Sequence, residues 1–138
     1  MNRENSQKTN ILVIDDEEVV RHSHLRVLSG TNCTVETAWN GPEGLRALEG
    51  HPFDVVLLDL RMPGMDGLDV LREIKSRWPE CEVVVVTGYP SLETAKEALR
   101  LGAYDYLCKP VEPDKVIDTT HSAVRQKRWT LHREALAA

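Results

Sequence analysis

The sequence predicts an α/β fold, with a doubly wound, five-stranded parallel sheet and an extended C-terminal helix. The first observation is a set of apolar runs, Ile11–Ile14, Val55–Leu58 and Val83–Val86, in which nearly every residue is valine, leucine or isoleucine. Such runs are typical of strands buried on both faces. The second observation is that strand and helix patterns alternate along the chain. Because parallel crossovers are almost always right-handed, helices are expected on both faces of the sheet.

The amino-terminal half predicts three strands and two helices. The strands are expected at residues 10–14, 33–38 and 53–58. The first helix is expected at residues 17–28, before Ser29-Gly30. The second helix follows Asn40, a residue type that caps helix amino termini, has a proline in its first turn, and ends near Gly50.

The carboxyl-terminal half continues the alternation. Asp66 is the expected cap of a helix that ends before Pro79, and a fourth strand follows at residues 82–86. A helix from Ser91 through residue 101 precedes Gly102, which stands where a C-terminal glycine is common. The fifth strand is expected at residues 104–108.

The last helix is longer than the domain requires. It is predicted from Pro113 to about Glu134, a length of about 33 Å at 1.5 Å per residue, and the core covers only part of it. Apolar residues recur every seven positions in it, but the companion positions are poor, so a coiled coil is only weakly indicated. The predicted organisation is a disordered segment at residues 1–9, a domain at 10–124 and a helical extension or linker at 125–138.

Length and composition limit the function classes. A chain of 138 residues suits one domain, and its net charge of −5 argues against a nucleic-acid surface, which is usually basic. No apolar stretch approaches the roughly 20 residues that span a bilayer. The polar amino terminus lacks the apolar stretch of a signal peptide. We therefore predict a cytoplasmic protein without a membrane segment.

Cysteines and histidines do not form a site in the sequence. Cysteine occurs at three positions without metal-ligand spacing, so packed, reduced thiols are expected. The histidines share no spacing with the acidic residues and are interpreted as surface or helix-face residues. These residues are Cys33, Cys81 and Cys108, and His22, His24, His51, His121 and His132.

Polar residues follow four of the predicted strands at their carboxyl ends. They are Asp15 and Asp16, Asp59, Thr87 and Lys109. Ligands of open parallel sheets bind at this edge. Taken singly, each residue has a plain structural explanation as a helix cap, a turn residue or a solvated side chain. Their joint occurrence on successive strand ends favours a site.

These residue types predict chemistry with a cation and a phosphoryl group. Clustered carboxylates repel one another, and oxygen ligands favour Mg²⁺ or Mn²⁺. One carboxylate can then act as a nucleophile that forms an acyl phosphate. Thr87 can donate a hydrogen bond to a phosphoryl oxygen, and Lys109 supplies a positive charge. We hypothesise a cis peptide bond at Lys109-Pro110, which would direct the ammonium toward the pocket.

Four motifs carry a resemblance to a known family. They are Val13-Ile14-Asp15-Asp16-Glu17, Leu58-Asp59-Leu60-Arg61-Met62-Pro63-Gly64-Met65-Asp66-Gly67, Val86-Thr87-Gly88-Tyr89 and Tyr106-Leu107-Cys108-Lys109-Pro110. From about Asn10 to about Ala123, the chain resembles the receiver domain of bacterial two-component response regulators. The resemblance implies a flavodoxin-like three-layer sandwich.

The resemblance also implies roles for individual residues. Asp59 would accept a phosphoryl group from a histidine kinase or phosphotransfer protein. Asp16, Asp59 and the backbone carbonyl of Arg61 would bind Mg²⁺, with Asp15 acting mainly through water. Thr87 and Lys109 would hold the phosphoryl oxygens. The switch residues would be Thr87 and Tyr106, an aromatic residue that turns inward when the threonine moves toward the phosphoryl group.

Within this family, two segments resemble receivers attached to ATPase activators of the alternative sigma factor, sigma-54. They are Thr87–Ser91 and Gly102–Tyr106. The chain has no Walker-type glycine loop and no following helix-turn-helix segment, so it is a lone receiver or a piece of a longer protein. A partner or homodimer surface is expected at residues 91–124 or on the C-terminal helix.

Two other function classes remain open. An aspartyl-phosphate phosphatase or phosphotransferase usually has a second acid two residues after the nucleophile, where this chain has Arg61. A receiver-like module that never accepts phosphate would not need the full set of site residues. We therefore predict no enzyme activity beyond self-phosphorylation and autodephosphorylation. Arg61 and Tyr89 are further expected to flank the phosphoryl group and to hinder attacking water.

Overall fold

The computed structural model describes residues 8–137, and these form five strands and five helices in strict alternation. The strands are β1 (Thr9–Ile14), β2 (Cys33–Ala38), β3 (Val55–Leu58), β4 (Glu82–Thr87) and β5 (Asp105–Cys108). The helices are α1 (Glu18–Ser29), α2 (Gly41–Gly50), α3 (Gly67–Arg77), α4 (Leu92–Arg100) and α5 (Pro113–Ala137). The predicted alternation is confirmed, with boundaries that differ by at most three residues.

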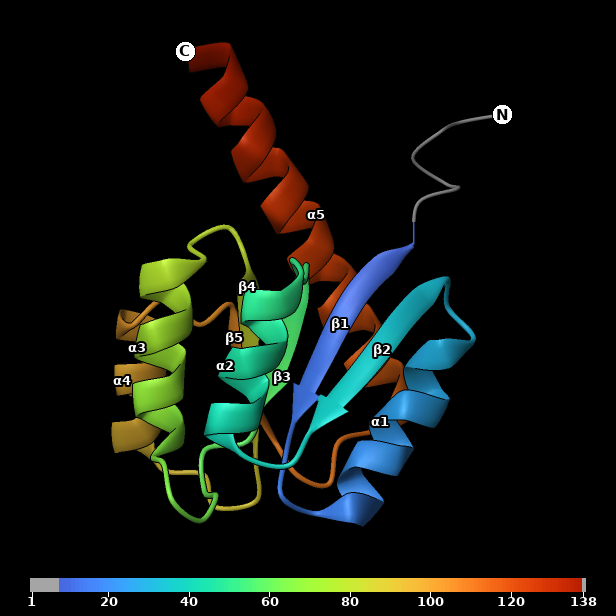
Figure 1. The fold of residues 1–138 in the computed structure, drawn as a ribbon, viewed down its shortest axis with the longest axis vertical. Helices are drawn as coiled ribbons and strands as arrows, with labels where there is room; N and C mark the ends of the chain where they lie inside the picture. Colours follow the sequence, from blue (N-terminus) through green and yellow to red (C-terminus); the bar gives the residue numbers. More distant parts are fainter. Residues whose placement is uncertain (1–7, 138) are drawn as a thin grey trace.

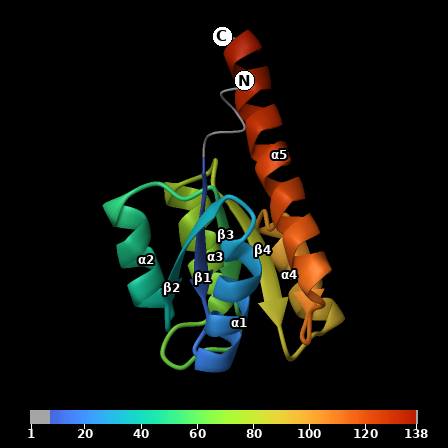
Figure 2. The ribbon, with the colours of Figure 1, turned by 90° about the vertical axis from the view of Figure 1, so that its right-hand side faces the viewer.

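All strands are parallel and lie in the order β2-β1-β3-β4-β5. Helices α1 and α5 cover one face, and α2, α3 and α4 cover the other (Figure 1 and Figure 2). The order reverses direction after β1, because β2 lies on one side of it and β3 on the other. This reversal is where ligands bind in doubly wound sheets. The predicted three-layer architecture is confirmed.

Two apolar clusters hold the layers together. Alternate residues of a strand point to opposite faces, so Leu12 and Ile14 pack under α2 and α3, whereas Ile11 and Val13 pack under α1 and α5. The central strands β1, β3 and β4 are buried almost completely. This double burial explains why their sequences lack the alternation of a half-exposed strand.

Helix starts follow the caps that the sequence predicts. Asn40 accepts a hydrogen bond from the Glu43 amide at 2.8 Å, and Asp66 accepts one from Leu68 at 2.9 Å. Gly102 has a φ angle of +103°, a conformation that favours glycine. At Gly67, a Cβ atom would lie 2.4 Å from the Cα atom of Leu60, so only glycine allows α3 to begin so close to the loop after β3.

The main differences from the predictions concern the ends of three elements. Strand β3 begins at Val55 rather than at residue 53, and α5 continues to Ala137, three residues beyond the predicted end. Thr9 belongs to β1, although residues 1–9 were predicted to be disordered. The remaining part of that prediction, residues 1–7, lies outside the described residues. In residues 8–137, no helix is both long enough and apolar enough to cross a membrane.

Two side chains differ from their predicted environments. Cys33 and Cys81 are buried as expected, but Cys108 at the end of β5 is exposed. His24 is a helix-face residue, yet it is only 7% exposed, because its face of α1 turns toward the sheet. Its Nδ1 atom has no hydrogen-bond partner.

Candidate functional site

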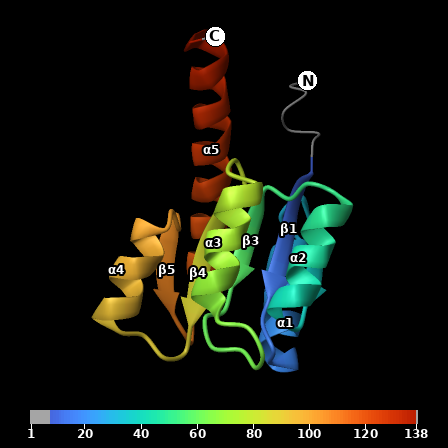
Figure 3. The ribbon, with the colours of Figure 1, turned by 60° about the vertical axis from the view of Figure 1, so that its left-hand side comes forward.

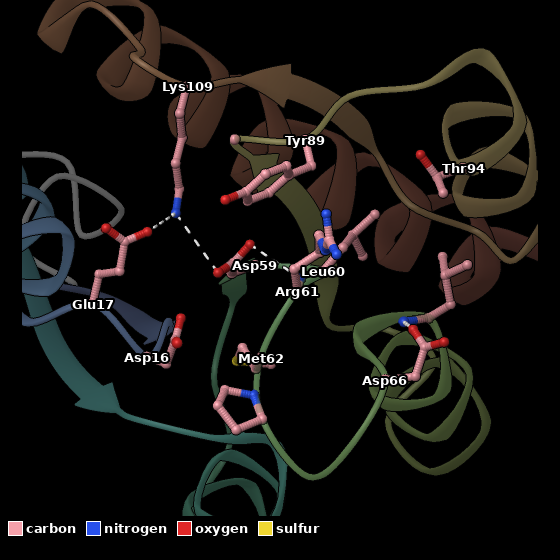
Figure 4. Close-up of a pocket in the computed structure, with 13 residues that line it drawn as sticks. Asp16, Glu17, Asp59, Leu60, Arg61, Met62, Asp66, Tyr89, Thr94 and Lys109 are labelled. Carbon is pink, nitrogen blue, oxygen red and sulfur yellow. Dashed lines mark hydrogen bonds and ion pairs between the residues drawn. The ribbon is translucent and has the colours of Figure 1, made fainter.

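The strands end at one edge of the sheet (Figure 3). Beyond that edge, Asp16, Asp59 and Lys109 line one cavity (Figure 4). Ile14 and Leu58 are paired across β1 and β3, so the residues that follow them, Asp15 and Asp59, are neighbours. The Asp59 amide donates to the Ile14 carbonyl at 3.0 Å. Parallel pairing therefore brings residues 44 positions apart in the sequence into one cluster.

Asp15 is buried, at 2% exposure, and its polar atoms all have partners. One carboxylate oxygen accepts the Glu17 amide at 2.9 Å, and the other lies 2.8 Å from the Lys109 ammonium. The Asp15 carbonyl accepts from the Arg21 guanidinium at 2.9 Å. Asp15 thus serves as a fixed support of the β1–α1 loop, with its lone pairs largely engaged.

Asp59 is 4% exposed and lies at the centre of the cluster. Its Oδ1 atom accepts the Arg61 amide at 3.3 Å, and its Oδ2 atom lies 3.7 Å from the Lys109 Nζ atom. Burial, together with the nearby Asp15 and Asp16 carboxylates, raises the pKa of Asp59 to about 6, although Lys109 acts in the opposite direction. The site therefore has more negative charge than Lys109 compensates.

Lys109 is the ammonium that faces this cluster, and the preceding prediction of a cis peptide bond at Lys109-Pro110 is confirmed. Burial disfavours its charge, but hydrogen bonding and attraction from Asp15, Asp59 and Glu17 outweigh burial and raise the pKa of Lys109. Its Nζ atom lies 3.5 Å from Glu17. Lys109 therefore stays protonated beside three carboxylates.

Asp15, Asp16 and Glu17 bring carboxylate oxygens within 4.8 Å of one another. Asp15, Glu17 and Asp59 lie beside the Lys109 ammonium, and Asp16 adds a fourth carboxylate to the cluster. Such a set of oxygen donors with excess negative charge fits a hard divalent cation such as Mg²⁺. Glu17 was absent from the predicted site residues. Its signal was available as the third acid of the Asp15-Asp16-Glu17 run.

Thr87 is fully buried, and its hydroxyl accepts the Tyr89 amide at 3.0 Å. The hydroxyl is thus engaged within its own turn. Its neighbours Gly88 and Tyr89 line the cavity of 820 Å³ at this edge, together with Asp59 and Lys109. Thr87 itself therefore lies behind the cavity wall, and its predicted hydrogen bond to a phosphoryl oxygen stays a prediction.

Arg61 and Tyr89 stand together beside Asp59 (Figure 4). The Arg61 guanidinium carbon lies 4.3 Å from the centroid of the Tyr89 ring, a cation–π geometry. Both residues are exposed on the open side of the cavity. The pair therefore lies beside Asp59, and its predicted effect on water that attacks a phosphoryl group stays a prediction.

Comparison with known proteins identifies the family. The family model described as response regulator receiver domain matches residues 11–121. The chain belongs to this family. It is 40% identical over 118 residues to the DNA-binding transcriptional regulator NtrC of Escherichia coli K12, an alignment that covers 86% of this chain and 25% of that protein. This receiver domain thus spans about a quarter of the length of that relative.

Solved structures support the same assignment. The receiver domain protein of Methanospirillum hungatei JF-1 superimposes with a TM-score of 0.87 at 29% identity, over 90% of this chain and 99% of that one. NtrX from Brucella abortus in complex with ADP superimposes with a TM-score of 0.89 at 33% identity, over 94% of this chain and 30% of that one. The predicted family and its fold are confirmed. Relatives that act in transcription agree with the predicted subgroup.

Tyr106, the predicted switch aromatic of this receiver domain, is tied to α4. Its hydroxyl lies 2.7 Å from the Thr94 hydroxyl, and the Ser91 amide donates to it at 3.3 Å. The Tyr106 ring is half-buried and packs against the cluster under α2, α3 and α4. Ser91 and Thr94 were not among the predicted site residues. Ser91 was recognised only as the start of a helix.

Proposed function

We propose that this receiver domain accepts a phosphoryl group on Asp59. The observation that carries the proposal is the position of Asp59 at the centre of the cluster, where Lys109 and the surrounding carboxylates meet. In the proposed reaction, an Asp59 carboxylate oxygen forms a bond to phosphorus while the bond from phosphorus to the donor breaks. The donor would be a histidine kinase or phosphotransfer protein.

Asp16, Asp59 and the Arg61 carbonyl would hold Mg²⁺ or Mn²⁺, with Asp15 acting through water. The bound cation would neutralise charge on the phosphoryl oxygens. Lys109 would contact another phosphoryl oxygen, since its ammonium already lies within 3.7 Å of Asp59. The close carboxylates of Asp15, Asp16 and Glu17 support this cation site.

A direct test is incubation with acetyl phosphate and Mg²⁺, followed by intact mass measurement. We expect the parent to gain one phosphoryl group, Asp59→Asn to gain none, and EDTA to prevent the gain. Asp66→Asn is the matched control, because Asp66 is an exposed carboxylate that lines the same cavity. Phosphorylated Asp59→Asn protein would show another acceptor and overturn the proposal.

If the parent gains no phosphoryl group from acetyl phosphate, a second phosphoryl donor is tested. A phosphohistidine protein separates a domain that accepts phosphate only from its protein donor from a module that never accepts it. Steady release of phosphate from external substrates would instead favour the phosphatase alternative. Arg61 supports the receiver assignment here, because the position two residues after Asp59 carries no general acid.

The proposed response to phosphorylation involves Thr87 and Tyr106. The Thr87 hydroxyl would leave its turn and donate to a phosphoryl oxygen, and Tyr106 would move into the vacated space. The hydrogen bonds from Tyr106 to Thr94 and Ser91 support a link to α4, because this movement would break them. Thr87→Ala should leave phosphorylation intact but weaken its effect on the face of residues 91–124.

We propose one surface for binding a partner. The face of residues 91–124 or the C-terminal helix would bind a partner or a second copy of the chain. The net charge of −5 supports the prediction that this chain does not itself bind nucleic acid. The division into a domain at 10–124 and an extension at 125–138, the cytoplasmic location and the restriction to self-phosphorylation and autodephosphorylation stay predictions.

A further inference from the structure

The second half of α5 is held to the domain differently from the first half. In the first half, Val116, Thr119, Thr120, Ala123 and Val124 form a buried stripe at helical spacing. Lys127 occupies the next position of this stripe, three residues after Val124. The helix has there passed beyond the apolar face of the sheet, and Figure 2 shows it continuing past the strand ends. A charged residue therefore replaces the apolar residue that the stripe would otherwise require.

Lys127 pairs with a residue far away in the sequence. Its Nζ atom lies 2.6 Å from the Asp54 Oδ1 atom, across 73 positions, and its side chain is only 14% exposed. Asp54 lies just before β3, at the edge of the sheet opposite the phosphorylation site. This contact joins the end of the helix to the amino-terminal edge of the sheet.

Asp54 is itself fixed by its backbone and side chain. Its second carboxylate oxygen accepts the Asn10 amide at 2.8 Å, and its own amide donates to the Asn10 carbonyl at 2.8 Å. Its carbonyl accepts the Glu82 amide at 3.1 Å. One aspartate thus connects the starts of β1, β3 and β4 with α5. Lys127 therefore binds to a rigid point rather than to a mobile surface side chain.

Apolar packing contributes little to holding α5 against the domain after Lys127. Residues 131–137 are all exposed, and a small cavity of 120 Å³ separates the helix from the α3–β4 loop, lined in part by Pro79, Thr130 and Leu131. Removing either partner of a partly buried ion pair is destabilising, because the other charge is left uncompensated. Of the ion pairs found in residues 8–137, the Lys127–Asp54 pair is the one that holds this part of the helix to the sheet, and Glu82 lines the same cavity as Lys127.

We propose that the Lys127–Asp54 ion pair is a latch that sets the direction in which α5 leaves the domain. With the latch closed, residues 128–137 keep one orientation relative to the sheet. With the latch open, the helix after Val124 pivots or frays. The latch acts independently of phosphoryl acceptance at the opposite edge.

The test measures the orientation of the helix end in the full chain. Spin labels are placed on Ser76→Cys in α3 and Arg133→Cys in α5, both exposed positions, in a Cys108→Ser background that removes the exposed native thiol. Pulsed electron paramagnetic resonance gives the distance distribution between them. We expect Lys127→Met and Asp54→Asn each to broaden it about twofold, as local opening of a weakly held segment predicts.

Three comparisons make the result decisive. Arg128→Met removes the same charge from the neighbouring, exposed position and should leave the distribution unchanged. Lys127→Arg should keep it narrow, and the double variant Lys127→Met with Asp54→Asn should broaden it no further than either single change. Circular dichroism shows whether Lys127→Met is still folded. If it is not, the distance distribution of Asp54→Asn is compared with that of the parent instead. A parent-like distribution in Asp54→Asn, or equal broadening by Arg128→Met, would overturn the latch.

Discussion

Asp59 combines two properties that normally oppose each other, burial and ionisation. Its carboxylate is nearly inaccessible and lies close to Asp15 and Asp16, and both effects raise its pKa to about 6. As the proposed phosphoryl acceptor, Asp59 would have to be ionised to react. The residue therefore needs nearby positive charge, which Lys109 supplies in part and a divalent cation would complete.

The raised pKa of Asp59 predicts how stability depends on pH. An unfolded aspartate titrates at about 3.9, so between about pH 4 and about pH 6 the folded domain binds more protons than the unfolded chain. The free energy of unfolding contributed by this group is therefore highest below this window and falls as the pH rises through it. The total loss is about 3 kcal/mol, from about 1.4 kcal/mol per pKa unit.

We accordingly expect Asp59→Asn to raise the thermal midpoint at neutral pH in EDTA, because the amide carries no charge. The advantage should disappear below about pH 4, where the parent carboxyl is protonated. Thermal unfolding across pH measures both effects. Asp66→Asn, at an exposed carboxylate, is the control and should show no such gain. Equal curves for Asp59→Asn and the parent at neutral pH would contradict this explanation.

The Arg61–Tyr89 pair predicts the lifetime of the phosphorylated state. Hydrolysis requires a water molecule to approach the phosphoryl group from the open side, where the guanidinium and the ring are stacked. We expect Arg61→Ala with Tyr89→Ala to speed dephosphorylation by about tenfold, equivalent to about 1.4 kcal/mol in the barrier. Loss of phosphoryl mass after donor removal gives the rate. Leu92→Ala, an exposed residue nearby in the sequence, is the control, and an unchanged rate in the double variant would refute the hypothesis.

The start of α4 is connected by hydrogen bonds to Tyr106, the proposed switch residue. The Ser91 hydroxyl accepts the Thr94 amide at 3.1 Å and lies 2.8 Å from the Thr94 hydroxyl, which in turn contacts Tyr106. The helix cap and the tyrosine therefore share one hydrogen-bonded chain. A displacement of the ring changes the environment of the first turn of α4.

We expect Ser91→Ala to lower the free energy of unfolding by about 1 kcal/mol, the usual effect of losing an N-cap. Urea unfolding measures this change, with Ser76→Ala in the exposed part of α3 as the control. Because the cap and Tyr106 share partners, Ser91→Ala combined with Tyr106→Phe should cost less than the sum of the single changes. Strict additivity would mean that the cap and Tyr106 are independent.

For the molecule as a whole, cation binding should be coupled to folding, because the acidic cluster exists only when β1 and β3 are paired. A cation at a hundred times its dissociation constant should raise the free energy of unfolding by about 2.7 kcal/mol. Thermal unfolding with Mg²⁺, with EDTA, and with NaCl at matched ionic strength measures this effect. Asp16→Asn should lose most of the gain. Equal stabilisation by NaCl would indicate charge screening instead of a site.

The central strands and the helix starts were the features of this fold that could be predicted best from the sequence. Runs such as Val55–Leu58 identify central strands because both of their faces must be apolar, and Asn40, Asp66 and Ser91 identify helix starts because each caps its own backbone. These are local effects. They depend on neighbours a few residues away, and so the sequence shows them directly.

Side-chain environments were less predictable. His24 and Cys108 both follow plausible patterns, yet His24 is buried and Cys108 is exposed. The orientation of the α1 face and the outer position of β5 in the sheet decide these environments. The hydrogen bonds of Tyr106 to Ser91 and Thr94 could not be predicted from the sequence either, because they join a strand and a helix whose spacing is set by packing.

The sequence by itself determined the alternation of elements, the parallel sheet, the family, and the residues at the strand ends. Each of these depends on residue type and local order. Only the tertiary structure decided the contacts: the engagement of Asp15 by Lys109, the inclusion of Glu17, the stacking of Arg61 on Tyr89, and the Lys127–Asp54 pair. Distances between groups far apart in the chain depend on how the layers pack, and no single segment carries that information.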